Sequence, residues 1–232
     1  MRNGKNRKGV YLKTMEKTYC VIGLGNFGTN VALTLAASRK RVVVIDMDKE
    51  RVNRIAREVS DAVCGDATDE AVLRQADVKD CECCIVCLER SIEGSAMITL
   101  SLKEMGIPHI IARASSERHE KLLRKLGADR VIFPERDAGR RLAQTVTVRD
   151  ALEYFKLSED LVICELAVPK SWVGKSPLEL DIRKNWNVNV IAYSKPGTDR
   201  FLLTSDPRIQ FFPDTYVVVA GDTKAIRKLT EK

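Results

Sequence analysis

The sequence predicts an α/β fold in which helices cover both faces of a parallel sheet, followed by a small α+β C-terminal module. Three observations predict it. An apolar run ends in Gly-x-Gly-x-x-Gly at residues 23–28, a second apolar run ends in Asp46, and strand-like and helix-like segments then alternate as far as residue 133. This alternation is typical of a doubly wound, Rossmann-like sheet.

The glycine motif predicts a strand at 19–22, a tight turn and the start of a helix. In such a turn the first glycine permits the bend, the second lets the backbone approach a pyrophosphate, and the third lets the helix pack closely on the strand. The first N–H groups of the helix have no intrahelical partner and attract an anion. The predicted phosphate-binding residues are Gly23, Gly25, Asn26, Phe27 and Gly28.

The second strand, at 41–46, ends in Asp46. An acid about 20 residues after the glycine motif accepts hydrogen bonds from ribose hydroxyls, and its charge repels a 2′-phosphate. The alternative is that Asp46 only caps the following helix. The pairing with the glycine motif favours the ribose contact.

Helical and strand periodicities continue in order after this acid. Gly106 and Pro108 supply the stop signal of the longest helix. The expected segments are a helix at 48–59, a strand at 62–64, a short helix at 70–75, a strand at 85–88, a helix at 91–105, a strand at 109–112, a helix from 116 to 127 and a strand at 130–133.

Ligands of such a sheet bind outside the carboxyl ends of its strands. Asp66 suits an adenine amino group or a ribose hydroxyl, and Arg113 suits a phosphate; the alternatives are a helix cap for Asp66 and a surface ion pair for Arg113. His119, in the first turn of the next helix, is expected beside a phosphate. Besides Asp46, the candidates at the strand ends are Gly65, Asp66, Cys87, Leu88, Glu89, Arg113, Ala114 and Ser115.

The cysteines are expected to be reduced, because their number is odd and no export signal opens the chain. Strand alternation would send Cys81, Cys83 and Cys87 to one face and Cys84 to the other, so these four thiols would not converge on zinc. We therefore expect buried small hydrophobic residues. The full set is Cys20, Cys64, Cys81, Cys83, Cys84, Cys87 and Cys164.

The second half of the sequence predicts a connecting helix followed by a β-rich module. Ala138, Leu142 and Val146 stand at i, i+4 spacing in a predicted helix at 137–148. Strands follow at 161–167, 188–193, 201–204 and 216–220, with helices at 176–180 and 222–229. The module is small for a catalytic substrate domain, and no catalytic triad or metal-ligand pair is legible. The Cys-x-x-Cys spacings at 81–84 and 84–87 fall in the predicted buried strand and are not interpreted as a redox motif. The sequence thus favours a non-enzyme over the alternative, an NAD-dependent oxidoreductase.

The charge and hydropathy of the sequence limit which classes of partner the protein can bind. The net charge is +7, but residues 1–17 carry six basic side chains against Glu16. This tail is expected to be disordered over 1–15. No apolar run is long enough to span a membrane, and no helix-turn-helix segment has room outside the two predicted modules. We therefore expect a cytoplasmic protein that does not bind nucleic acid.

Five motifs carry a resemblance to a known family. They lie at 21–28 (VIGLGNFG), 44–46 (VID), 65–68 (GDAT), 126–135 (LGADRVIFPE) and 217–222 (VVVAGD). With them the chain resembles the regulator-of-potassium-conductance (RCK) subunits of the Trk/Ktr potassium-uptake systems. The resemblance implies a basic tail at 1–15, an RCK N-terminal nucleotide-binding domain at 16–134, a connecting and dimerisation helix at 135–149 and an RCK C-terminal domain at 150–232.

The resemblance also implies a function. Such subunits bind ATP, ADP or NAD(H) without turning it over, and their dimers assemble into a ring at the inner face of the membrane, beneath a potassium channel or transporter. Glu135 matches an acidic position where some members hold a divalent cation, Mg²⁺ or Ca²⁺; the alternative is an exposed acid at a helix start. Many relatives have arginine at the position of Asn26. The shorter, uncharged asparagine weakens ATP-over-ADP discrimination and favours NAD(H) or AMP-type ligands.

Overall fold

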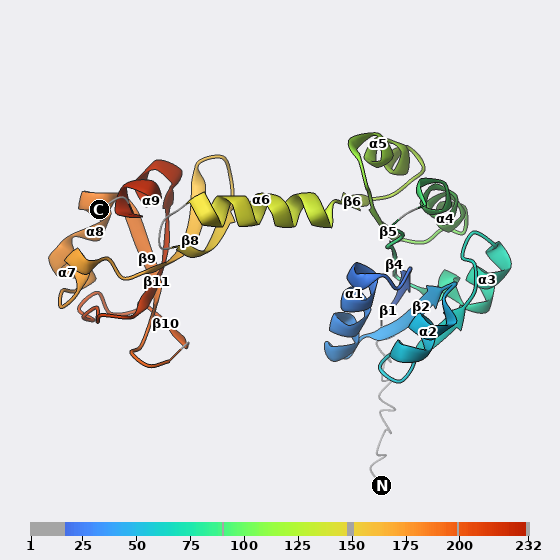
Figure 1. The fold of residues 1–232 in the computed structure, drawn as a ribbon, viewed down its shortest axis with the longest axis horizontal. Helices are drawn as coiled ribbons and strands as arrows, with labels where there is room; N and C mark the ends of the chain where they lie inside the picture. Colours follow the sequence, from blue (N-terminus) through green and yellow to red (C-terminus); the bar gives the residue numbers. More distant parts are fainter. Residues whose placement is uncertain (1–16, 90, 148–150, 199, 231–232) are drawn as a thin grey trace, which may run out of the picture. The chain divides into compact units, whose positions relative to one another are not determined.

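A computed structural model describes residues 17–89, 91–147, 151–198 and 200–230. The predicted basic tail at 1–15 lies outside these residues. The chain divides into two compact units, Met1–Pro134 and Glu135–Lys232 (Figure 1). Within the described residues, no helix combines the length and the apolarity that crossing a bilayer requires.

The first unit is built on one parallel sheet, which confirms the predicted doubly wound fold. Among the described residues its strand order is β3-β2-β1-β4-β5-β6. The strands are β1 (Thr18–Ile22), β2 (Arg41–Asp46), β3 (Asp61–Cys64), β4 (Cys83–Val86), β5 (His109–Arg113) and β6 (Arg130–Ile132). The order reverses between β1 and β4, so a crevice is expected beside the ends of these two strands.

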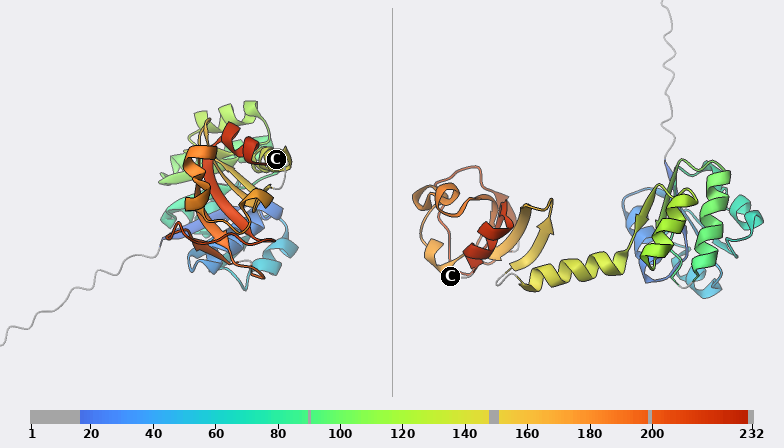
Figure 2. Two further views of the ribbon diagram at one scale, coloured as in Figure 1. Left: turned by 90° about the vertical axis from the view of Figure 1, so that its left-hand side faces the viewer. Right: turned by 90° about the horizontal axis from the view of Figure 1, so that it is seen from above.

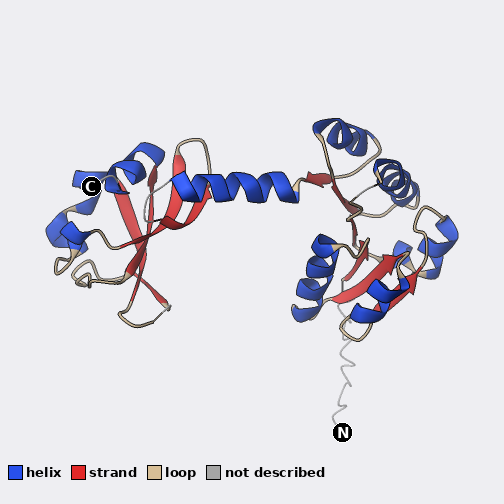
Figure 3. Ribbon diagram, viewed as in Figure 1, coloured by secondary structure: helices blue, strands red, loops and turns tan. Residues whose placement is uncertain are grey.

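Helices cover both faces of this sheet (Figure 3). Side chains of α1 and α2 share one hydrophobic cluster with the sheet, and side chains of α3, α4 and α5 share the other. Strands buried on both faces read as continuous apolar runs, as β2 does at 42–45. The helical segments are α1 (Asn26–Ala37), α2 (Lys49–Ile55), α3 (Glu70–Gln75), the 3₁₀ turn η1 (Val78–Asp80), α4 (Ile92–Glu104) and α5 (Glu117–Lys125).

The predicted faces of the cysteine cluster are wrong for one residue. Cys81 shares a hydrophobic cluster with Cys20 and Cys84, whereas Cys83 and Cys87 lie in the cluster on the other face. Strand alternation holds only from Cys83, where β4 begins, because Cys81 follows η1 and precedes the strand. The neighbouring thiols of Cys81 and Cys84, together with burial, raise the pKa of Cys20 well above its usual range.

The second unit holds an antiparallel sheet with the order β10-β9-β11-β8-β7 among the described residues. Its strands are β7 (Ala151–Lys156), β8 (Leu161–Ala167), β9 (Val188–Ser194), β10 (Phe201–Leu203) and β11 (Tyr216–Asp222). Its helical segments are α6 (Pro134–Thr147), η2 (Lys170–Trp172), α7 (Pro177–Leu180), α8 (Ile182–Trp186) and α9 (Thr223–Thr230). The helix α9 packs on β8 and β11 (Figure 2).

An aromatic group anchors the core of this unit. The Trp172 ring is fully buried, with its centroid 5.4 Å from that of Phe211 and 5.6 Å from that of Trp186. Alternate residues of β8 and β11 point into the same core, as expected for an antiparallel sheet covered on one face. The second unit therefore has a hydrophobic core of its own.

Candidate nucleotide-binding site

A cavity of about 290 Å³ lies at the carboxyl ends of β1 to β4, where the strand order reverses. Eight of the predicted site residues line it: Gly23, Gly25, Asp46, Gly65, Asp66, Cys87, Leu88 and Glu89. Six lining residues were not predicted: Ile22, Ile45, Met47, Arg51, Ala67 and Ile98. The apolar walls and the few polar groups at the rim are typical of a small-molecule site.

The glycine turn forms one wall of this cavity. Gly23 has a φ of +95°, a conformation that favours glycine, and its N–H donates to the Ile45 carbonyl at 2.8 Å. A Cβ on Gly28 would overlap the Gly23 carbonyl oxygen, so the third glycine allows α1 to lie against the turn. Gly25 is the N-cap residue of α1, and no side chain forms a cap hydrogen bond there. The first N–H groups of α1 thus offer an anion site.

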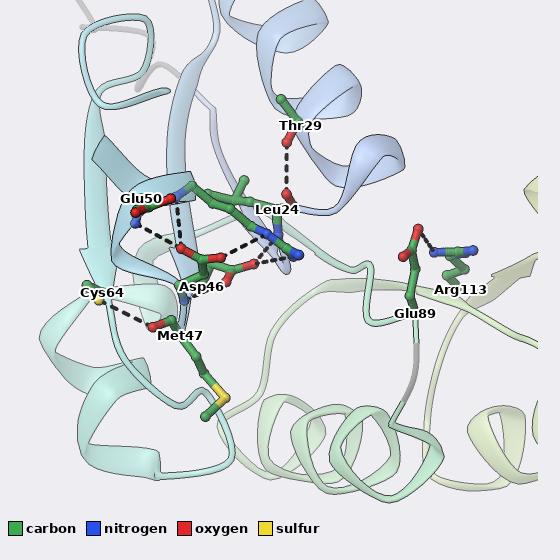
Figure 4. A network of polar contacts seen from close by, with 10 residues as sticks. Leu24, Thr29, Asp46, Met47, Glu50, Cys64, Glu89 and Arg113 are labelled. Atoms are coloured by element: carbon green, nitrogen blue, oxygen red, sulfur yellow. Dashed lines mark hydrogen bonds and ion pairs between the residues drawn. The ribbon is translucent and has the colours of Figure 1, made fainter. Parts of the chain in front are cut away.

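Asp46 ties this turn to the end of β2 (Figure 4). Its carboxylate accepts the Leu24 N–H at 2.5 Å and the Asp48 N–H at 2.8 Å, and the Arg51 guanidinium lies 3.9 Å away. The cap of α2 is Asp48, whose side chain accepts the Glu50 and Arg51 N–H groups. The alternative role for Asp46 as a helix cap is therefore not observed, and its carboxylate faces the cavity.

Asp66 lies two residues after the end of β3. Its carboxylate accepts the Thr68 N–H at 2.9 Å and the Thr68 hydroxyl at 2.8 Å, and these hydrogen bonds hold the pKa of Asp66 below its usual range. The cap of α3 is Asp69 rather than Asp66. Asp66 is thus an exposed, ionised acceptor on the cavity rim.

An ion pair joins the ends of β4 and β5. Arg113 Nη1 lies 3.1 Å from Glu89 Oε1, with 11% of the arginine side chain and 43% of the glutamate side chain exposed (Figure 4). Arg113 is therefore largely buried, unlike the surface arginine that the alternative supposed. Burial raises the pKa of the neighbouring Cys87 to about 12, which keeps it a neutral thiol in the wall.

The other predicted residues do not line this cavity. Asn26 lines an adjoining hollow between α1 and α2, which also contains Arg54 and Glu58. Phe27 packs in the core beneath α1, Gly28 and Ala114 are buried, and Ser115 is exposed on the loop after β5.

His119 is buried beneath the loop after β5 and accepts a hydrogen bond from its backbone. Its Nδ1 accepts the Ser115 N–H at 3.2 Å, and its Nε2 lies 2.8 Å from the Ser95 hydroxyl on α4. Because Nδ1 accepts a backbone N–H, we assign the proton of the neutral ring to Nε2. Burial lowers the pKa of His119, which favours this neutral form.

Glu135 is exposed in the first turn of α6. Across the residues that the structure describes, no group of three or more histidine, cysteine or acidic side chains could hold a metal ion. One carboxylate is a poor cage for Mg²⁺ or Ca²⁺, so other ligands would have to complete such a site.

The TrkA-N domain family model matches residues 19–134, from β1 to the start of α6. The chain belongs to the TrkA-N family. Two relatives extend the match along this TrkA-N protein. The Ktr system potassium uptake protein C of Bacillus subtilis is 36% identical over 78% of this chain and 82% of its own length. The Ktr system potassium uptake protein A of Vibrio alginolyticus is 31% identical over 94% of this chain and 99% of its own length.

The fold of the TrkA-N protein also occurs in a solved channel. The structure described as the GsuK channel bound to NAD matches with a TM-score of 0.64 and 21% identity. The match covers 95% of this chain and 40% of the channel chain, so the present chain corresponds to less than half of that protein.

Proposed function

We propose that this chain is a cytoplasmic, nucleotide-sensing subunit of a potassium-uptake system. Its likeness to Ktr system potassium uptake proteins, over 78% of the chain in one relative and 94% in another, supports the transport system. The cavity at the switch point of its sheet supports the nucleotide. The subunit acts as a regulator and not as an enzyme, because the relatives that it matches along most of its length are potassium uptake proteins.

Asp46 carries the proposal. Its carboxylate binds the backbone of the glycine turn and also faces the cavity, so one acid sets the shape of the phosphate-binding turn and offers an acceptor to a ribose. Each carboxylate oxygen has two acceptor sites, and the hydrogen bonds from Leu24 and Asp48 use one on each oxygen. Acceptor capacity therefore remains for ribose hydroxyls.

The ligand is an adenine nucleotide, either NAD(H) or ATP/ADP. The cavity and the adjoining hollow share Gly25, Arg51 and Glu89, so a ligand longer than a mononucleotide has a continuous path past the glycine turn. The uncharged Asn26 beside this path favours NAD(H) or a less charged mononucleotide over ATP.

The regulatory step is a population shift. Two copies of the chain pair, the dimers form a ring, and the ring contacts a potassium channel or transporter at the inner face of the membrane. A nucleotide biases the ring only by as much as it binds one ring geometry better than another. Glu135 would bind a divalent cation, Mg²⁺ or Ca²⁺, only if a nucleotide phosphate or a partner subunit supplied the remaining ligands.

A thermal-shift titration with ATP, ADP, AMP, NAD and NADH, with and without Mg²⁺, tests the proposal. We expect at least one nucleotide to raise the Tm as its concentration passes Kd. In Asp46→Asn the affinity should fall by about tenfold or more, because a ribose hydroxyl loses its charged acceptor. The matched control is Asp61→Asn, at the opposite end of β3 from the cavity. A flat response to every nucleotide, or turnover of NADH with a small metabolite, would overturn the proposal.

A further inference from the structure

We propose that Glu89 competes with the phosphates of the ligand, so that its carboxylate must leave Arg113 and Gly25 before a diphosphate can bind. The inference rests on the proposed nucleotide site and concerns its selectivity. It assigns to Glu89 a charge-dependent role that a mere wall residue would not have.

The position of the carboxylate is the first observation. A Cβ placed on Gly25 would lie 3.4 Å from Glu89 Cδ, 3.4 Å from Oε1 and 3.7 Å from Oε2. The glutamate therefore covers the side of Gly25 that has no side chain. That is the side by which a glycine in this motif admits a pyrophosphate. Glu89 also lines both the cavity and the adjoining hollow.

The electrostatic surroundings are the second observation. Gly25 begins α1 without a side-chain cap, so the positive end of the helix faces the carboxylate. The Arg113 guanidinium lies 3.1 Å away. Helix N-termini and arginine are the two groups that proteins use most readily to hold phosphate. The carboxylate thus lies where the anionic part of a nucleotide would find its partners.

A phosphate and the carboxylate do not share this place without cost. Two like charges in close contact repel each other, and they repel several times more strongly near a protein surface than in bulk water. The more exposed partner is the one that can turn away: 43% of the Glu89 side chain is exposed, against 11% of Arg113. Arg113 then stays in place and can pair with the entering phosphate.

This competition should discriminate between ligands by the negative charge that each places at the glycine turn. Adenosine carries no phosphate and should not be affected by the charge of Glu89. ADP and NAD place a diphosphate at the glycine turn and should be penalised. ADP carries about three negative charges at neutral pH, whereas the AMP phosphate and the NAD pyrophosphate carry about two each, so AMP and NAD should lie between adenosine and ADP.

The experiment measures Kd by calorimetry at one fixed ionic strength for adenosine, AMP, ADP and NAD. The key variant is Glu89→Gln, which keeps size and removes charge. We expect Kd for ADP to fall several-fold to about tenfold, Kd for AMP and NAD to fall by a smaller factor, and Kd for adenosine not to change. Glu104→Gln, in the last turn of α4, removes the same charge elsewhere and should change nothing. Arg113→Gln should weaken ADP binding.

Each other result overturns the inference. Weaker ADP binding by Glu89→Gln would make the carboxylate a ligand contact, and an equal gain for adenosine and ADP would make the effect steric. Should Glu89→Gln misfold, Glu89→Ala is measured in its place and must give the same order of effects. If wild type binds nucleotides but the variants match it, only this inference fails. If neither wild type nor variants bind any nucleotide, the proposed function fails with it.

Discussion

At the scale of single residues, hydrogen bonds from backbone N–H groups to side chains stabilise the loops at the rim of the sheet. The Leu24 N–H donates to Asp46, the Thr68 N–H donates to Asp66 and the Ser115 N–H donates to His119. Each of these side chains stabilises the loop that it belongs to or faces. A buried N–H that loses its acceptor costs about 1 to 3 kcal/mol. Substitutions at the rim therefore affect loop structure as well as ligand contacts.

Gly28 gives the sharpest prediction at this scale. In Gly28→Ala the new Cβ would overlap the carbonyl oxygen of Gly23, which is backbone and cannot turn aside. We expect a loss of about 3 kcal/mol or more in the free energy of unfolding, measured by urea denaturation. The control is Gly139→Ala in α6, where a Cβ meets nothing within 4 Å and should stabilise the helix slightly. An unchanged midpoint for Gly28→Ala would contradict the close packing of α1 on the turn.

His119 predicts a pH dependence of stability. Burial holds its pKa below the usual value of about 6.5 in the unfolded chain, so the unfolded state binds the proton more readily. Stability is fully present above about pH 6.5 and falls as the pH drops toward the lowered pKa. In His119→Asn the side-chain amide oxygen can still accept the Ser115 N–H and does not titrate. Between pH 7.5 and 5.5 the Tm of wild type should fall further than that of His119→Asn. Equal slopes would contradict the prediction.

The site could be predicted from sequence where neighbouring positions along the chain determine it. Gly23 and Gly25 lie just after β1 and Asp46 is the last residue of β2, so the predicted strands already place them at the rim. Arg51 and Ile98 line the cavity from helices α2 and α4. Whether a helical residue reaches the cavity depends on the angle between that helix and the strand before it. No local pattern encodes that angle. Residues of this kind could not be predicted without the fold.

At the scale of elements, α6 exposes two large apolar side chains more fully than α1, α4 and α5 expose theirs. Leu142 is 66% exposed and Val146 is 72% exposed, at i, i+4 spacing on one face. Like many helices it begins at a proline, Pro134, three residues before the predicted start at 137. An apolar stripe in water is the mark of a surface that a partner covers.

This stripe predicts a dimer that one charge would weaken. In Leu142→Glu the charged side chain would have to lose water on pairing, so we expect the dimer Kd to rise tenfold or more. Analytical ultracentrifugation over a concentration series measures it. Arg140→Glu, about 160° around the helix from Leu142, introduces the same residue away from the stripe and should leave Kd nearly unchanged. Equal effects of the two variants would show that charge alone, and not the stripe, controls pairing.

Two elements of the second unit lay beyond what periodicity can predict. Among the strands that the structure describes, the edge strand β7 pairs with β8 alone, and its register shifts between Ala151 and Glu153, which breaks simple alternation. The helix α8 is five residues long and lies between Asp181 and Asn187, both with positive φ. A five-residue helix is too short to show a 3.6-residue period. The longer strands β8, β9 and β11, by contrast, were expected close to where they lie.

At the scale of the whole molecule, the two units keep separate hydrophobic cores. Clusters of the first unit draw on β1 to β6 and their helices, and the cluster of the second draws on residues from Tyr154 onward. A ligand stabilises the structure that it binds and leaves unchanged whatever unfolds independently of it. The stability of each unit is therefore the quantity to follow when a nucleotide is added.

The chain supplies a separate reporter for each unit. Both tryptophans, Trp172 and Trp186, lie in the second unit, so emission in urea follows that unit alone. Five buried thiols lie in the first unit: Cys20, Cys81, Cys83, Cys84 and Cys87. In a Cys164→Ser variant, which removes the buried thiol of the second unit, their reaction with a chromogenic disulfide in urea follows the first unit. A nucleotide at 100 times its Kd should protect these thiols by about 2.7 kcal/mol and leave the tryptophan transition in place. If the tryptophan transition moves by the same amount, the units unfold as one, and nucleotide binding in the first is coupled to the second.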